Sequence, residues 1–102
     1  MAAIQKMTRE ELISAQGNLV EIKIQLKNCK KLQGRSLENG LMDISSERLW
    51  NIDKRMVKTI QALPNHVNDY YPNIKYQIDN MISRVERKLD LIARELKKKK
   101  NK

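Results

Sequence analysis

The chain has 102 residues, of which 40% are hydrophobic and 32% charged, and it carries a formal net charge of +9 at pH 7. This length indicates one domain, because two separate cores would each be too small to bury enough apolar surface. The apolar fraction excludes a disordered chain, and the absence of a run of about 18 apolar residues excludes a transmembrane helix. The first residues lack the apolar core of a secretion signal, so we expect a cytoplasmic protein.

The residue types available for a core favour an all-α fold. Phenylalanine is absent and aromatic residues amount to 4%, so Ile, Leu, Val and Met must fill the interior. The single cysteine, Cys29, has no partner for an internal disulfide and falls on an apolar helical stripe. It is therefore predicted to be a buried, reduced thiol.

The first predicted helix spans residues 8–33. Thr8 and Glu11 have the spacing of a capping box, and Met7 is placed to pack onto Leu12. An apolar stripe then recurs at alternating steps of three and four, and Gly34 offers a left-handed residue that ends the helix. The stripe consists of Leu12, Ala15, Leu19, Ile22, Leu26 and Cys29.

Residues 34–45 are predicted to form a loop, because Gly34 and Gly40 stand there among serine and aspartate. Its apolar residues are expected to fold back against the helices. They are Leu37, Leu41, Met42 and Ile44.

The second predicted helix spans residues 46–71. Pro64 lies inside it and predicts a kink or a break, since proline removes a hydrogen bond and clashes with the preceding turn. The apolar phase continues on both sides of Pro64, which favours a kink. The stripe is Leu49, Ile52, Met56, Ile60, Leu63, Val67 and Tyr70.

The third predicted helix spans residues 73–98 and follows a boundary at Pro72. Its stripe is Ile78, Ile82, Val85, Leu89, Ile92 and Leu96. Three helices of nearly equal length predict an antiparallel three-helix bundle with coiled-coil-like packing. The alternative is a long helical hairpin with one proline-kinked arm that needs a second chain.

Signals of catalysis or metal binding are weak in this sequence. His66 is the only histidine, and although Asp69 follows at helical spacing, a surface pair explains both residues. No phosphate-binding loop, nucleophile elbow or paired-carboxylate motif is present. We therefore expect no enzyme, no cofactor, no metal and no small-molecule substrate.

The positive charge is concentrated near the C-terminus, where residues 73–102 hold ten of the 21 Lys and Arg residues. On the third helix the basic residues spread over the face opposite the apolar stripe, while Asp79, Glu86 and Asp90 gather along one edge. Such a face could contact phosphates without reading base sequence, or it could simply be solvated. The candidates for a nucleic acid or an acidic partner are Arg84, Arg87, Lys88, Arg94, Lys97, Lys98, Lys99, Lys100 and Lys102.

A second set of apolar residues lies outside the main stripes. Ile13, Val20 and Ile24 form a second line on the first helix, and Trp50 and Val57 are seven residues apart on the second. These residues are either core or a contact surface for another protein. The candidate interface residues are Val20, Ile24, Trp50 and Val57.

The apolar residues outside the main stripes, together with the absence of catalytic motifs, favour a non-catalytic helical interaction module. Such a module would dock on a partner protein or associate with itself. A nucleic-acid-associated protein that uses the basic third helix and lysine tail is the alternative. Binding to a membrane surface is disfavoured, because the third helix has no Trp or Phe on its apolar face.

Overall fold

A computed structural model describes residues 4–70 and 73–100. For Lys100 it describes the backbone but not the side chain. Every regular element in these ranges is helical. The α-helices are α1 (Arg9–Cys29), α2 (Gly34–Met42), α3 (Lys54–Ala62) and α4 (Ile74–Lys100). The 3₁₀ turns are η1 (Ile4–Lys6), η2 (Glu47–Leu49) and η3 (Leu63–His66). The predicted all-α class is therefore confirmed.

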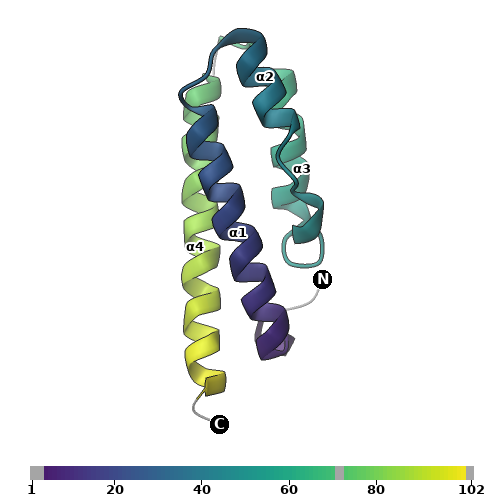
Figure 1. Ribbon diagram of the computed structural model, residues 1–102, viewed down its shortest axis with the longest axis vertical. Coiled ribbons are helices and arrows are strands. Elements are labelled where there is room, and N and C mark those ends of the chain that lie inside the picture. The colour runs from purple at the N-terminus through teal and green to yellow at the C-terminus, as the bar shows by residue number, and fades with distance from the viewer. Residues whose placement is uncertain (1–3, 71–72, 101–102) are drawn as a thin grey trace.

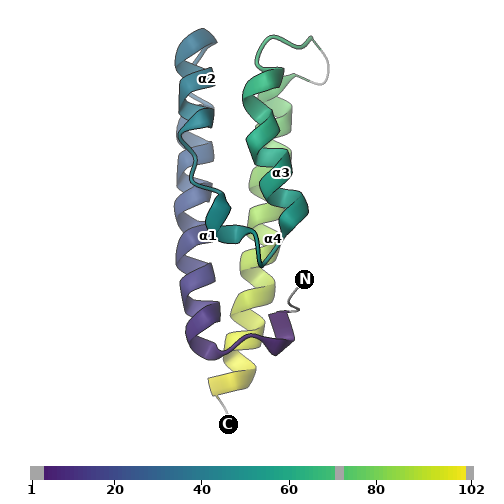
Figure 2. The same ribbon diagram turned by 90° about the vertical axis from the view of Figure 1, so that its right-hand side faces the viewer.

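Two long helices and two short ones build the molecule, which measures 49 × 23 × 21 Å. α1 and α4 lie side by side and run in opposite directions along the long axis (Figure 1). α2 and α3 form a shorter antiparallel pair that covers one half of the α1–α4 hairpin (Figure 2). The chain thus forms four packed α-helices of unequal length in place of the three equal helices predicted.

The predicted start of α1 is confirmed in detail. The backbone N–H of Glu11 donates to the Thr8 hydroxyl at 3.1 Å, and the Thr8 N–H donates to the Glu11 carboxylate at 2.9 Å. These two bonds satisfy donors that the first helical turn leaves free. The bond from the Thr8 N–H, with a smaller contribution from the Thr8 side chain, lowers the pKa of the Glu11 carboxyl because it favours the charged form.

α1 ends at Cys29, four residues before the predicted end. The Lys75 ammonium of α4 donates to the carbonyls of Cys29 at 3.5 Å, of Leu32 at 2.6 Å and of Lys30. A cation is favourable at this end of a helix, where the carbonyls are unpaired and the helix dipole is negative. Gly34 does adopt the left-handed conformation, with φ of 57°, but it begins α2.

The prediction of a loop over residues 34–45 is wrong, because α2 occupies most of it. Leu37 and Leu41, one turn apart, are both 2% exposed, and their burial outweighs the low helix propensity of glycine. At Gly40 an added Cβ would lie 3.0 Å from Leu32 Cδ1 and 3.2 Å from Cys29 Sγ, so glycine permits the close approach to the end of α1. Met42, expected to pack inward, is 64% exposed.

The predicted helix over residues 46–71 is also wrong. Its first part is the turn η2, and α3 begins only after Asp53, whose carboxylate accepts the Met56 N–H at 3.0 Å. Pro64 ends the helix rather than kinking it, because α3 stops at Ala62 and Pro64 lies in the 3₁₀ turn η3. Beyond η3, Tyr70 is fully exposed.

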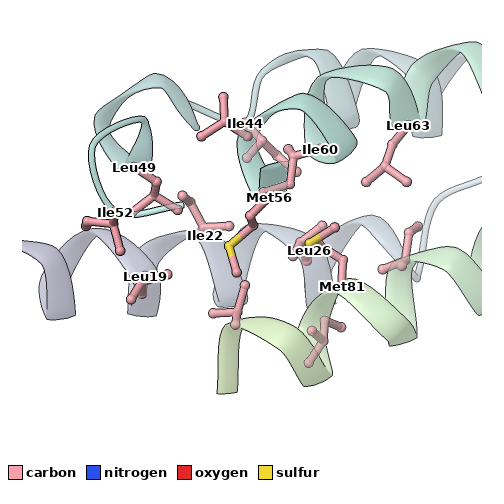
Figure 3. Close-up of a cluster of buried hydrophobic side chains, with 14 of the residues drawn as sticks. Leu19, Ile22, Leu26, Ile44, Leu49, Ile52, Met56, Ile60, Leu63 and Met81 are labelled. Atoms are coloured by element: carbon pink, nitrogen blue, oxygen red, sulfur yellow. The ribbon is translucent and has the colours of Figure 1, made fainter. Parts of the chain in front are cut away.

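The core lies where α1 and α4 meet the shorter pair formed by α2 and α3 (Figure 3). It contains all six residues of the first predicted stripe, including Cys29, and the residues of the second stripe from Leu49 to Leu63. From α4, Ile78, Ile82, Val85 and Ile92 are buried, whereas Leu89 and Leu96 are only partly buried. Ile74 and Met81 are buried as well, although the stripe did not include them.

The predicted third helix is confirmed, with a start at Ile74 and an end at Lys100. The Asn73 side chain accepts the Lys75 N–H at 2.8 Å and so caps its first turn. The predicted boundary at Pro72 lies outside the described residues. At the other end the lysine run continues the helix, since the Glu95 carboxylate lies 3.9 Å from the ammonium groups of both Lys98 and Lys99.

Candidate interaction surfaces

Three large aliphatic side chains form a line on the outer side of α1. Ile13 is 49% exposed, Val20 is 42% exposed and Ile24 is 53% exposed. On a helix with 3.6 residues per turn their mean direction lies roughly 150° from that of the buried residues of α1. They therefore point away from the core, and we call Ile13, Gly17, Val20 and Ile24 the outer stripe of α1.

Gly17 lies in the middle of the outer stripe. A Cβ added to Gly17 would have nothing within 4 Å, so the fold itself does not require glycine at this position. The backbone of α1 is therefore uncovered between Ile13 on one side and the Val20–Ile24 pair on the other. Another helix could approach the backbone of α1 closely there.

Charged residues lie one step beyond the two ends of the outer stripe. Glu10 precedes Ile13 by three residues, and Lys27 follows Ile24 by three. Both side chains are exposed, and neither has an ion-pair partner in residues 4–70 and 73–100. Arg9, four residues before Ile13, is exposed as well, so the end of the stripe near Ile13 carries both charges and the end near Ile24 carries a positive charge.

The other two candidate interface residues do not extend the outer stripe. Val57 is fully buried in the core and contributes nothing to the surface. Trp50 is 42% exposed next to η2, and the Lys54 ammonium lies 5.1 Å from the centre of its ring, a cation–π contact. Of the four candidates, the structure brings only Val20 and Ile24 together.

Three of the basic candidates line one side of the surface between α3 and α4. Arg84 and Arg87 border a groove of about 400 Å³ together with Thr59 of α3, and they continue into a second hollow with Lys88. Lys88 lies 3.6 Å from the Asp53 carboxylate. Neither arginine has a hydrogen bond or ion pair with any residue that the structure describes.

The other basic candidates are partly neutralised or differently placed. Arg94 pairs with Asp90 at 2.9 Å, and Lys98 and Lys99 share Glu95. Lys99 also donates to the Gln5 carbonyl at 3.3 Å and so joins the end of α4 to the N-terminal turn. Lys97 is exposed, whereas the Lys100 side chain and Lys102 lie outside the described part of the chain.

The acidic edge of α4 contributes to the packing of the two long helices. Lys23 of α1 pairs with Glu86 at 3.0 Å, and Lys30 pairs with Asp79 at 2.6 Å. These carboxylates are held toward α1, so they do not neutralise the side of α4 that carries Arg84 and Arg87. The sequence pattern showed this acidic edge but not what it contacts.

His66 and Asp69 are the polar pair that the sequence analysis considered for catalysis. Their side chains lie 2.7 Å apart, and both are more than 40% exposed. In the described ranges no three His, Cys, Asp or Glu side chains gather as a metal site would require, and no helix has the length and hydropathy to cross a membrane.

Burial raises the pKa of the Cys29 thiol, with a smaller opposing effect of Lys75.

Comparisons of the chain with protein-family models, with curated proteins and with solved structures find no match.

Sequence reasoning missed several residues of these surfaces. Gly17, Glu10 and Lys27 have a readable signal, because they continue the spacing of Ile13, Val20 and Ile24 at steps of three and four. Thr59 could not be assigned to the α4 groove in this way. Its position beside Arg84 depends on how α3 packs, and the sequence pattern did not predict α3 as a separate helix.

Proposed function

We propose that this protein is a non-catalytic helical interaction module whose outer stripe on α1 packs against a helix of another polypeptide. The observation that carries this proposal is the exposure of Ile13, Val20 and Ile24 in one line on a helix that already buries its opposite face. Fully burying an aliphatic side chain of this size is worth about 1.5–3 kcal/mol. Because these three are already about half-buried, covering the rest would contribute roughly half of that for each, which still favours a partner.

The comparison with α4 supports a special role for this face. α4 is the longest helix, yet its outward side is mostly charged and carries Leu91 and Tyr76 as isolated exposed apolar residues. Scattered apolar residues of that kind are ordinary on protein surfaces. The outer stripe of α1 instead follows the spacing of a helix–helix seam, with steps of seven and four residues.

Photo-crosslinking in cells tests the proposed surface. We expect benzoylphenylalanine in place of Val20 to give an adduct of one defined mass after irradiation, since the residue would lie inside the contact. The same amino acid in place of Lys58, which is exposed on α3, is the matched control and should give no such adduct. The adduct should disappear when Ile24→Asp is added.

Equal adduct yields at positions 20 and 58, or an adduct that survives Ile24→Asp, would show that the outer stripe is not a docking surface. Folding of each variant is checked by circular dichroism. Ile24 is 53% exposed, so its replacement should leave the fold intact and separate loss of binding from loss of structure.

A second candidate function is binding to nucleic acid through the groove between α3 and α4. The observation that favours it is that Arg84 and Arg87 line one groove with no ionic partner in the described residues. Arginine binds phosphate oxygens with two parallel hydrogen bonds, and a duplex would release counterions on contact.

Salt dependence of binding tests this candidate. For a labelled DNA duplex of mixed sequence, Arg84→Gln combined with Arg87→Gln should reduce the slope of log affinity against log salt by about 0.9 for each lost phosphate contact. Lys31→Gln combined with Arg35→Gln removes the same charge from exposed positions near the start of α2 and should change the slope less. No binding to the duplex at low salt, or equal effects of the two double variants on the slope, would contradict the proposal that this groove binds nucleic acid.

A further inference from the structure

We infer that the groove between α3 and α4 binds a small phosphomonoester, with Arg84 and Arg87 holding its phosphate group. This site is separate from the outer stripe of α1, so the inference goes beyond the interaction module proposed above. It shares the two arginines with the nucleic-acid candidate but assigns them a different ligand. The sequence pattern predicted no small-molecule substrate and could not show this groove, because the groove exists only where α3 packs beside α4.

The two arginines lie at the centre of the groove, which consists of two adjoining hollows. One hollow has a volume of about 400 Å³ and the other of about 260 Å³, and Arg84 and Arg87 line both of them. The two residues are about one helical turn apart, so their guanidinium groups can reach the same bound group. Arg84 is partly buried, whereas Arg87 is exposed.

Positive charge collects on this side of α4. Arg84 precedes Arg87 by three residues and Lys88 by four, and like charges at these spacings repel each other on a helix. On α3, Arg55 lies one turn before Thr59, which borders the groove, and adds to the positive charge there. A bound anion would relieve this repulsion.

The nearby acidic residues do not neutralise the two arginines. Among the described residues, none that lines the larger hollow is acidic. Asp53 lines the smaller hollow, where its carboxylate lies 3.6 Å from Lys88 Nζ. Glu86 pairs with a lysine of α1 at 3.0 Å, and Asp90 pairs with Arg94 at 2.9 Å. The donors of both guanidinium groups therefore remain open to a ligand.

A phosphomonoester matches this set of donors better than a carboxylate or a phosphodiester. At pH 7 it carries a charge of about −1.5 to −2 and three strong acceptor oxygens. Each guanidinium group can donate two parallel hydrogen bonds to such a group. A carboxylate or a phosphodiester has a single negative charge and two free oxygens, so it would use fewer of the donors.

The rest of the larger hollow fits a hydroxylated organic body. Its volume lies toward the lower end of the roughly 300–1,000 Å³ of small-ligand sites, so it can hold more than a phosphate group. Asn80 and Ser83 line it, and neither side chain has a hydrogen-bond partner among the described residues. The Thr59 hydroxyl donates to the Arg55 carbonyl at 2.9 Å and can still accept a hydrogen bond. These neutral groups suit the hydroxyls of a sugar phosphate.

Titration of the ¹⁵N-labelled protein, followed by nuclear magnetic resonance, tests the site. With ribose 5-phosphate at constant ionic strength, we expect the backbone and side-chain N–H signals of Arg84 and Arg87 to shift and to saturate. Inorganic phosphate should shift the same signals with lower affinity, because it lacks the sugar. Dimethyl phosphate, a model of the nucleic-acid backbone, and sodium chloride should saturate neither signal at the same ionic strength.

Variants separate recognition by guanidinium groups from net charge. Arg84→Gln combined with Arg87→Gln should weaken binding of ribose 5-phosphate by about tenfold or more, because hydrogen bonds to a charged group are lost. Arg84→Lys combined with Arg87→Lys keeps both charges but not the paired donors, and it should also weaken binding. Lys31→Gln combined with Arg35→Gln is the matched control and should change the affinity by less than about twofold, since screening limits distant charges. Circular dichroism checks that each variant is folded.

The outcomes separate this inference from both functions proposed above. Equal shifts with ribose 5-phosphate and dimethyl phosphate, or an affinity that Arg84→Gln with Arg87→Gln leaves unchanged, would overturn the phosphomonoester site. If DNA binding nevertheless depended on the two arginines, the nucleic-acid candidate would stand without this inference. Equal affinities for inorganic phosphate and ribose 5-phosphate would overturn the assignment of a sugar to the larger hollow. Photo-crosslinking at position 20 is independent of these results, because it reports on the outer stripe.

Discussion

Leu26→Ala should lower the free energy of unfolding by about 2–5 kcal/mol, a large part of the roughly 5–15 kcal/mol of a typical domain. Leu26 is fully buried and belongs to the cluster that includes Met56 of α3 and Met81 of α4 (Figure 3). Its truncation would leave a cavity among three helices. The expected change is a drop in the thermal midpoint of about 10 °C or more, measured by far-UV circular dichroism.

Ile24→Ala is the matched control on the same helix. Ile24 is two residues from Leu26 but 53% exposed, so its truncation should change the free energy of unfolding of the monomer by no more than about 0.5 kcal/mol. Equal losses at the two positions would show that α1 does not present the faces described.

Lys75→Met should lower the free energy of unfolding by about 1.5–3 kcal/mol, toward the lower end because the side chain is only half-buried. The ammonium group donates to three carbonyls at the end of α1, and methionine retains most of the side-chain volume but no donor. The loss would leave those carbonyls with fewer partners. Urea unfolding followed by Trp50 fluorescence and circular dichroism measures it.

Lys58→Met is the control for this change, since Lys58 is exposed on α3 and the substitution is chemically the same. It should change stability by no more than about 0.5 kcal/mol. If Lys75→Met were equally mild, the contact between α4 and the end of α1 would not contribute to stability, and the early end of α1 would need another cause.

Local signals in the sequence determined the parts of the fold that depend on few neighbouring residues. The Thr8–Glu11 capping box set the start of α1 because both partners lie within one helical turn. The alternating apolar spacing from Ile78 to Leu96 similarly predicted α4. For residues 46–63 the same periodicity correctly gave the buried residues but not the element, since Leu49 and Ile52 reach the core from a turn.

Only the tertiary structure decided where α1 ends, that residues 34–42 form a helix, and that the second apolar line of α1 stays exposed. At the end of α1 the Cys29 carbonyl accepts from Lys75, which is 46 residues away in sequence, and in α2 the burial of Leu37 and Leu41 outweighs the low helix propensity of two glycines. The side of α1 that carries Leu12 to Leu26 packs against α4 and the α2–α3 pair, which leaves Ile13, Val20 and Ile24 exposed on the other side. Spacing predicted the line from Leu12 to Cys29 as core but left the second line open between core and surface, because its burial depends on neighbours that are distant in the chain.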